Sequence, residues 1–270
     1  SAVAVIDGAT LTGEATVTEG NTSASNYIES TETEESTVIA VNTMTAKPYT
    51  DLASAISSAE KGDTIRLVKD FTLDAPESGL ISGQGAINIT KNLTIDGNGK
   101  EITAGANFSK NASDSRGEYH IINIMDGANV TIQNLTIDGQ STTDNSAPRS
   151  GINIFTADNA SDKTTVLLET VTVKNCSTYG VTCGGSVLSV TDITTENNAW
   201  GGINVDNTSS SATGATFTMN SGTIKEDNSI FIENSKSVTS GLEITIHDGT
   251  FNGTVSIAKD NNDEDISGVT

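Results

Sequence analysis

Short stretches in which apolar and polar residues alternate recur along most of the chain. Two series of three-residue segments carry apolar side chains at their first and third positions. One series is Ile122–Ile124, Ile152–Ile154, Val181–Cys183, Ile203–Val205, Ile230–Ile232 and Val255–Ile257, and the other is Val130–Ile132, Val166–Leu168, Leu188–Val190, Phe217–Met219 and Ile244–Ile246. Successive side chains of a strand point to opposite faces. Each segment therefore predicts a short strand with two side chains in a core and one outside.

A third series is a five-residue motif with threonine at its centre. The central residues are Thr72, Thr94, Thr136, Thr172, Thr194, Thr223 and Thr250. The shortest interval between successive motifs is 22 residues, which is typical of a β-solenoid rather than of a helical repeat. The three series together predict an all-β parallel solenoid of about seven turns, with three short strands in each turn. The threonines are expected to form one outward-facing column.

A short amphipathic helix is expected between residues 50 and 60, just before the first repeat. Thr50 is placed to cap its N-terminus, and Leu52, Ile56 and Ala59 lie on one face. Gly62 is expected to stop the helix. We predict that the apolar face of this helix covers the otherwise open end of the first turn.

Differences in composition divide the chain into four parts. Residues 1–37 are rich in Thr, Ser and Glu and are interpreted as a polar lead-in or linker. Residues 38–62 form the expected N-terminal cap, made of a strand and the helix. Residues 63–258 hold the predicted solenoid. Residues 259–270 are expected to be an acidic C-terminal tail.

The formal net charge of −21 excludes two classes of primary partner. A nucleic acid or an anionic membrane surface would be repelled by so acidic a protein. The longest apolar stretches are far shorter than the roughly 20 residues of a membrane-spanning helix, so no membrane insertion is expected. The two cysteines, Cys176 and Cys183, are interpreted as small buried apolar residues, with a disulfide across a turn as the alternative.

Two longer segments resemble the right-handed parallel β-helix superfamily of pectate lyases, in particular its bacterial secreted and cell-surface members. They are Tyr49–Leu67, which reads as a helix followed by a strand, and Asn92–Lys100. The resemblance covers roughly residues 38–257. It implies a right-handed single-stranded β-helix and an extracellular or cell-surface location. We expect the protein to be a monomer. Such a scaffold hosts lyases, hydrolases, adhesins and inert stalks, so the resemblance implies no single activity.

An enzymatic function would depend on catalytic residues, some of which are scarce in this chain. A lyase like those of the superfamily would need an Arg or Lys base beside calcium, and the arginines available are Arg66, Arg116 and Arg149. A glycoside hydrolase would need converging carboxylates, for which Asp126, Asp158, Asp206 and Glu233 are candidates because each follows a strand of the first series. We assign no catalytic residue. His120 and His247 are interpreted as structural or exposed.

No cofactor is expected, with calcium as the alternative. The densest acidic group is Asp260, Asp263, Glu264 and Asp265, but its spacing is neither that of an EF-hand nor that of a calcium-binding nonapeptide. A solvated acidic tail is the preferred interpretation.

The candidate ligand site lies on the predicted outer face of the first strand series. Asn123, Asn153, Thr182 and Asn204 occupy the middle position of successive strands and are expected to form an exposed column that hydrogen-bonds sugar hydroxyls. Tyr179 and Trp200 precede two of these strands and could stack on a sugar ring or pack on the neighbouring turn. The predicted binding residues are Asn123, Asn153, Asn204, Tyr179, Trp200 and Asp206.

The expected function is that of a non-catalytic adhesin or carbohydrate-binding protein, with a glycan or a host or cell-wall surface as partner. An extracellular polysaccharide lyase or glycoside hydrolase is the first alternative. An inert surface stalk is the second.

Overall fold

The structure is a computed structural model that describes residues 37–74, 85–105, 108, 120–140, 150–157, 160–207, 214–233 and 242–257. The chain divides into two units, Ser1–Thr37 and Val38–Thr270, and every helix and strand described below lies in the second. Several predictions fall outside the described residues. They concern the lead-in before Thr37, Arg116, Arg149, Asp158 and the acidic tail at 259–270.

The described residues form two β-sheets. The thirteen-stranded sheet, here called the first sheet, contains β1 (Ala40–Asn42), β2 (Lys47–Tyr49), β3 (Thr64–Leu67), β4 (Phe71–Leu73), β6 (Leu93–Ala104), β8 (Asn129–Asp138), β10 (Thr165–Lys174), β12 (Val187–Thr191), β13 (Ile193–Glu196), β15 (Thr216–Met219), β16 (Gly222–Ile224), β18 (Glu243–Ile246) and β19 (Thr250–Phe251). The seven-stranded second sheet contains β5 (Gly85–Ile89), β7 (His120–Ile124), β9 (Ile152–Phe155), β11 (Tyr179–Gly184), β14 (Gly201–Asp206), β17 (Asn228–Glu233) and β20 (Thr254–Ile257).

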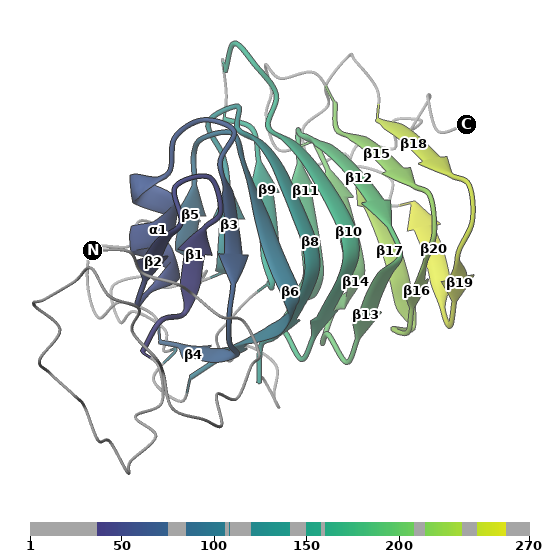
Figure 1. Cartoon of the computed structure of the whole chain (residues 1–270). Coiled ribbons are helices and arrows are strands. Elements are labelled where there is room, and N and C mark those ends of the chain that lie inside the picture. The colour runs from purple at the N-terminus through teal and green to yellow at the C-terminus, as the bar shows by residue number, and fades with distance from the viewer. Residues whose placement is uncertain are drawn as a thin grey trace, which may run out of the picture. The chain divides into compact units, whose positions relative to one another are not determined.

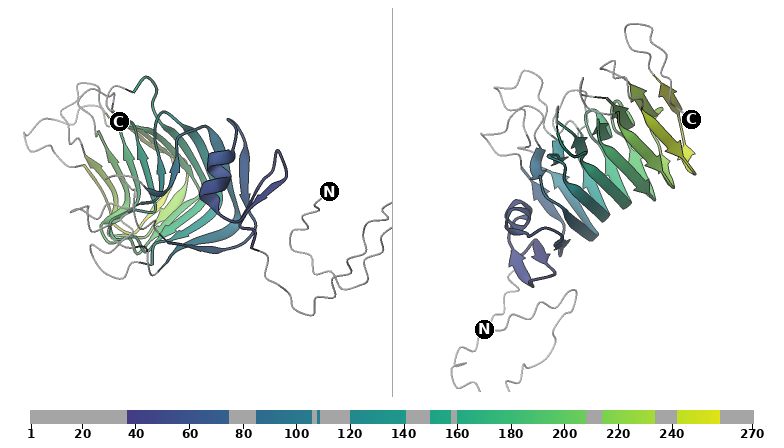
Figure 2. Two further views of the ribbon diagram at one scale, coloured as in Figure 1. Left: turned by 90° about the vertical axis from the view of Figure 1, so that its left-hand side faces the viewer. Right: turned by 90° about the horizontal axis from the view of Figure 1, so that it is seen from above.

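From β5 onward the chain passes alternately between the two sheets. Each passage through both sheets, here called a circuit, adds its strands beside those of the previous circuit, and all of these strands pair in parallel. Figures 1 and 2 show the resulting stack, which runs from β5 and β6 to β18, β19 and β20. Antiparallel pairing among the described strands is confined to β1 with β2 and with β3. The fold is thus mostly β, with parallel sheets and one described helix.

The core lies between the two sheets and is built from in-register columns of apolar side chains. Both predicted three-residue series pair residue by residue. Ile122, Ile152, Val181, Ile203 and Ile230 align along the second sheet, and Val130, Val166, Leu188, Phe217 and Ile244 align along the first. Nearly all of these side chains are fully buried. Because the core between the sheets is narrow, aliphatic side chains fill it and few aromatic side chains are needed.

The first sheet bends at one position in each of the circuits that contain β8, β10 and β12. Asn134, Thr170 and Asp192 lie at this bend with φ of 53°, 54° and 54°. Residues in this left-handed region turn the chain sharply. In β8 and β10 the two halves of the strand remain continuous through the bend, whereas Asp192 separates β12 from β13. Two segments of the first sheet and one of the second thus give three strand segments per circuit.

The predicted threonine column is wrong at its first two members. Thr136, Thr172, Thr194, Thr223 and Thr250 do pair in succession. Thr94 instead pairs with Thr131, and Thr72 pairs with Thr103. Thr94 lies in the half of the first sheet before the bend, whereas the column lies after it. Thr72 lies after the bend but two positions beyond the column, because Glu101 rather than Thr103 pairs with Thr136.

Helix α1 (Leu52–Ser58) packs against β1, β2 and β5 at the N-terminal end of the stack. Its N-cap is Asp51 rather than Thr50, because the Asp51 carboxylate accepts a hydrogen bond from the Ser54 backbone N–H at 2.7 Å. Leu52, Ile56 and Ala59 are buried as expected. The helix ends earlier than predicted, since the backbone becomes extended at Ala59, and Gly62 lies in the following turn with φ of 90°.

Cys176 and Cys183 are free thiols in the buried core. Burial raises the pKa of Cys183 to about 12 and that of Cys176 further, so neither forms a thiolate near neutral pH. Within the described part of the chain, no helix has the length and apolar character required to cross a membrane.

Candidate functional site

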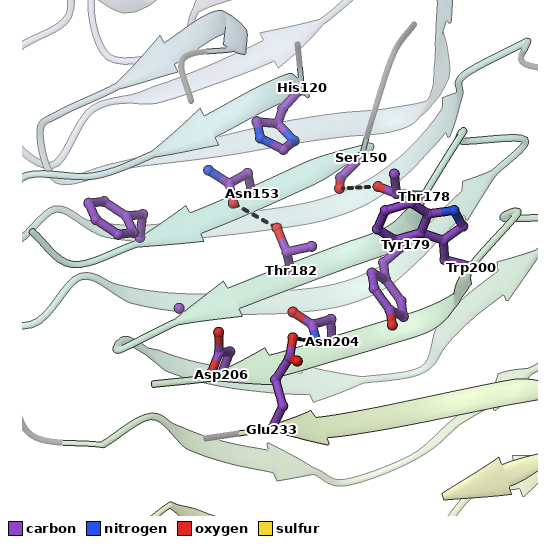
Figure 3. Close-up of a pocket in the computed structure, with 12 residues that line it drawn as sticks. His120, Ser150, Asn153, Thr178, Tyr179, Thr182, Trp200, Asn204, Asp206 and Glu233 are labelled. Atoms are coloured by element: carbon purple, nitrogen blue, oxygen red, sulfur yellow. Dashed lines mark hydrogen bonds between the residues drawn. The ribbon is translucent and has the colours of Figure 1, made fainter. Parts of the chain in front are cut away.

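A groove of about 290 Å³ runs across four strands of the second sheet, β9, β11, β14 and β17, and reaches the start of β7 (Figure 3). Its lining combines polar side chains with an aromatic end. The lining residues are His120, Ser150, Asn153, Phe155, Thr178, Tyr179, Thr182, Gly184, Trp200, Asn204, Asp206 and Glu233. Apart from Ser150 and Thr178, which precede β9 and β11, the polar lining residues lie on neighbouring strands, so their side chains are spaced at roughly the 4.8 Å separation of strands.

The middle of the groove carries the predicted amide column. Asn153, Thr182 and Asn204 align in register, and Asn88 and Asn123 continue the column to β5. Asn153 Nδ2 donates to Asn123 Oδ1 at 2.6 Å. Thr182 Oγ1 donates to Asn153 Oδ1 at 2.7 Å, as Figure 3 shows. The column is therefore a hydrogen-bonded ladder whose members orient one another.

The prediction that the whole column is exposed is wrong. Asn123 is completely buried and Asn204 is 8% exposed. Both faces of β7 are covered, and Asn123 Nδ2 also contacts Met125 Sδ at 3.2 Å. Asn153 and Thr182, which are partly buried, are the ladder members that reach the groove most openly. Asn123 contributes to the site only by orienting Asn153.

Two aromatic side chains, Tyr179 and Trp200, form one end of the groove, and Phe231 packs against Tyr179. The Tyr179 ring meets Trp200 edge-on, with centroids 6.0 Å apart, and stacks nearly parallel to Phe231 at 6.2 Å. Trp200 remains 43% exposed. It also borders a second hollow of about 340 Å³ beside Glu226 and Asn228, so its ring lies between two concave surfaces. Tyr179 packs on its neighbours as the alternative interpretation predicted, while Trp200 keeps a substantial part of its surface open.

Two carboxylates lie side by side at the other end. Asp206 of β14 and Glu233 of β17 are register partners on adjacent strands, and both line the groove. Asn204 Nδ2 donates to Glu233 Oε1 at 3.0 Å. Burial raises the pKa of Glu233 above its ordinary value, and the Asp206 charge raises it further, despite the lowering effect of the Asn204 hydrogen bond. The pair can hold a positively charged group.

The electrostatic effect of Glu233 extends to the aromatic end. Burial raises the pKa of Tyr179 to about 12, with the Glu233 charge as the second cause, although a hydrogen bond with Asn228 opposes the shift. The tyrosine therefore stays a neutral phenol at physiological pH. Its hydroxyl lies in the negative potential of the groove.

Five of the six predicted binding residues line this groove: Asn153, Asn204, Tyr179, Trp200 and Asp206. The structure also places Glu233 in the lining and Phe231 against Tyr179, and the predicted set omitted both. Phe231 occupies the middle position of its strand, in register with Asn204. Continuing the column by one more repeat would have found it. His120 lines the groove at the start of β7, although it was interpreted as structural or exposed.

Two of the remaining candidates that the structure describes lie outside the groove. Asp126 lies in the turn after β7, at φ 59° and without a place in the groove. Arg66 lies on β3 in the first sheet, where its Nε is 2.9 Å from Asp96 Oδ2. Among the described residues, no group of three or more His, Cys, Asp or Glu side chains is arranged to hold a metal ion.

Comparison with family models, with curated proteins and with solved structures found no match for this chain. The resemblance to pectate-lyase-like proteins therefore stays a prediction from the quoted segments.

Proposed function

We propose that the chain is a right-handed single-stranded parallel β-helix that binds carbohydrate, without catalysis, in the groove across β9, β11, β14 and β17. The alternation of the chain between two parallel sheets supports the β-helix, since each circuit adds one layer to the stack. In this proposal the protein is a monomer that acts outside the cell or on a bacterial cell surface, with a glycan or a host or cell-wall surface as partner.

The observation that carries the binding proposal is the exposed Trp200 ring at the end of a groove lined with amides, hydroxyls and carboxylates. A sugar ring has an apolar face and a polar rim, so it needs an aromatic surface beside hydrogen-bonding groups. Tyr179 contacts the Trp200 ring edge-on and limits its movement. The amide ladder holds Asn153 and Thr182 in fixed orientations, which reduces the entropy lost on binding.

A glycan array followed by calorimetry tests this proposal. We expect Trp200→Ala to weaken binding of the best array ligand by about tenfold or more, as for a central aromatic contact. Met44→Ala is the matched control, because Met44 is a 70% exposed apolar residue outside the groove. Melting temperatures of both variants check that folding is intact. An array without any bound glycan would favour the inert stalk, and equal binding by the Trp200 variant would remove the groove from the proposal.

A glycoside hydrolase is the second candidate, and the paired Asp206 and Glu233 favour it. Hydrolysis of a glycosidic bond uses two carboxyl groups, one of which must hold a proton. Glu233, with its raised pKa, suits the acid, and Asp206 suits the ionised partner. Release of reducing ends from a bound oligosaccharide, abolished by Glu233→Gln, would replace the non-catalytic proposal with this one. Binding without product release would exclude it.

A further inference from the structure

We propose that the groove selects saccharides that carry a free amino group, with the ammonium bound between Asp206 and Glu233. This inference rests on the proposed carbohydrate binding and specifies the chemical class of the ligand. The charged side chains that line the groove support it. No Lys or Arg is present among the described residues that line it, whereas two adjacent carboxylates are.

The position of the two carboxylates makes their mutual repulsion effective. They are register partners on neighbouring strands and lie on the same side of the sheet in Figure 3. Glu233 is half-buried, so solvent screens its charge incompletely. A cation placed between the two would offset both the repulsion and the loss of hydration. An ammonium has three N–H donors, which can serve both carboxylates at once.

The surroundings hold Glu233 in place for such a contact. Asn204 donates from Nδ2 both to Glu233 Oε1 at 3.0 Å and to the Phe231 carbonyl at 3.4 Å. The carboxylate is therefore tied to the strand that also carries Asp206. Further along the groove, the hydroxyl of Tyr179 lies within the field of Glu233, and the aromatic face can attract a cation as well.

The same arrangement disfavours acidic sugars. A uronate carboxylate in this groove would face two like charges, and no described Lys or Arg lines the groove to offset them, which is a repulsive element against the wrong ligand. A neutral N-acetylated sugar would meet no such repulsion but would also lack the ionic contacts. The expected order of affinity is amino sugar, then neutral sugar, then uronate.

Calorimetric titrations with three oligosaccharides of equal length test this order. The probes are glucosamine oligomers, N-acetylglucosamine oligomers and oligogalacturonate, at about pH 7, where an amine of ordinary pKa is still largely protonated and the two carboxylates are ionised. We expect the glucosamine oligomers to bind about tenfold or more tightly than the N-acetylated ones, as for hydrogen bonds between charged groups. Asp206→Asn and Glu233→Gln should each remove most of this preference, measured as the ratio of the affinities for the two oligomers.

Asp192→Asn is the matched control for net charge. Asp192 is exposed at the bend of the first sheet, away from the groove, and asparagine tolerates its φ of 54°. It should leave the preference within about twofold of the unsubstituted protein. An equal loss with this control would overturn the inference, because overall charge would then explain the selectivity.

The remaining outcomes separate this inference from the proposal on which it rests. Equal or tighter binding of the neutral or uronate oligomer, weakened by Trp200→Ala, overturns the amino-sugar inference and leaves carbohydrate binding standing. Failure of all three oligomers to bind, while the glycan array reveals another ligand that lacks an amino group, also overturns only the inference. If the glycan array also shows no bound ligand, both the amino-sugar inference and the proposed carbohydrate binding are overturned.

Discussion

At the scale of single residues, Glu226 and Glu233 differ in the hydrogen bonds that their carboxylates accept. Glu226 accepts hydrogen bonds from Thr195 Oγ1 at 2.7 Å and from Asn198 Nδ2 at 2.6 Å, so its two oxygens are both served. Glu233 accepts one from Asn204 and faces the Asp206 charge. The carboxylate in the groove is thus the less favourably placed of the two. Proteins often retain such unfavourable placement where a ligand is bound.

We predict that Glu233→Gln stabilises the protein at neutral pH. The folded-state pKa of Glu233 is raised, so above it the ionised carboxyl costs the folded state free energy that the unfolded chain does not lose. As the pH falls through this raised pKa, the folded protein takes up the proton and the cost disappears. The melting temperature of the variant should therefore exceed that of the unsubstituted protein at about pH 7, and the difference should vanish near pH 4.

Glu196→Gln provides the control for that measurement. Glu196 pairs with Lys225 at 2.6 Å on the first sheet, and its removal should give no stabilisation at neutral pH. A lower melting temperature for Glu233→Gln than for the unsubstituted protein at about pH 7 would contradict the assigned electrostatics.

At the scale of elements, two identical pentapeptides occupy different places in the first sheet. Both Asn92–Asp96 and Asn134–Asp138 read Asn-Leu-Thr-Ile-Asp. The first pairs with the half of β8 before the bend, and the second forms the half after it. Either half accepts two inward apolar side chains and an outward threonine. The pentapeptide alone therefore does not determine on which side of the bend it lies.

This ambiguity marks how far the sequence predicts the structure. Alternation of side chains fixed the inward and outward residues of the two three-residue series, because that property belongs to each strand by itself. The register of β6 depends on the irregularity between Asp96 and Lys100, which shifts everything before it. The groove was partly predictable for the same reason. Column neighbours such as Asn153 and Asn204 follow from register, but the complete burial of Asn123 depends on tertiary packing.

We predict that Thr170→Asn stabilises the protein by about 0.5–1 kcal/mol. Thr170 lies at the bend with φ 54°, where a β-branched side chain is strained, and the equivalent positions of neighbouring circuits hold Asn134 and Asp192. Asparagine adopts this conformation readily. The shift in the urea midpoint of unfolding measures the effect.

Thr172→Asn is the matched control, two residues away in the regular part of β10. Here the threonine suits an ordinary strand, so asparagine should leave stability unchanged or lower it slightly. Equal effects of the two substitutions would show that the backbone at Thr170 is not the cause.

At the scale of the unit Val38–Thr270, the two ends of the stack differ. Helix α1 packs on the N-terminal end. At the other end, Val255 and Ile257 of β20 are 42% and 47% exposed, although they are in register with the buried Ile230 and Ile232. The same apolar pattern therefore has different energetic value in different circuits, because burial depends on having a layer on both sides. Only the three-dimensional stack reveals this difference.

The final prediction compares two residues of one column, of which one is buried and the other is exposed. Ile232→Ala removes a side chain that is 1% exposed between layers and should cost about 2–5 kcal/mol through lost burial and a cavity. Ile257→Ala, the register partner in the last described strand of the second sheet, should cost less than about 1 kcal/mol because its side chain already meets solvent. Urea unfolding of both variants measures the difference. Equal costs would mean that this end of the stack is covered in solution, and dilution over a wide range of protein concentrations would then show whether a second copy provides the cover.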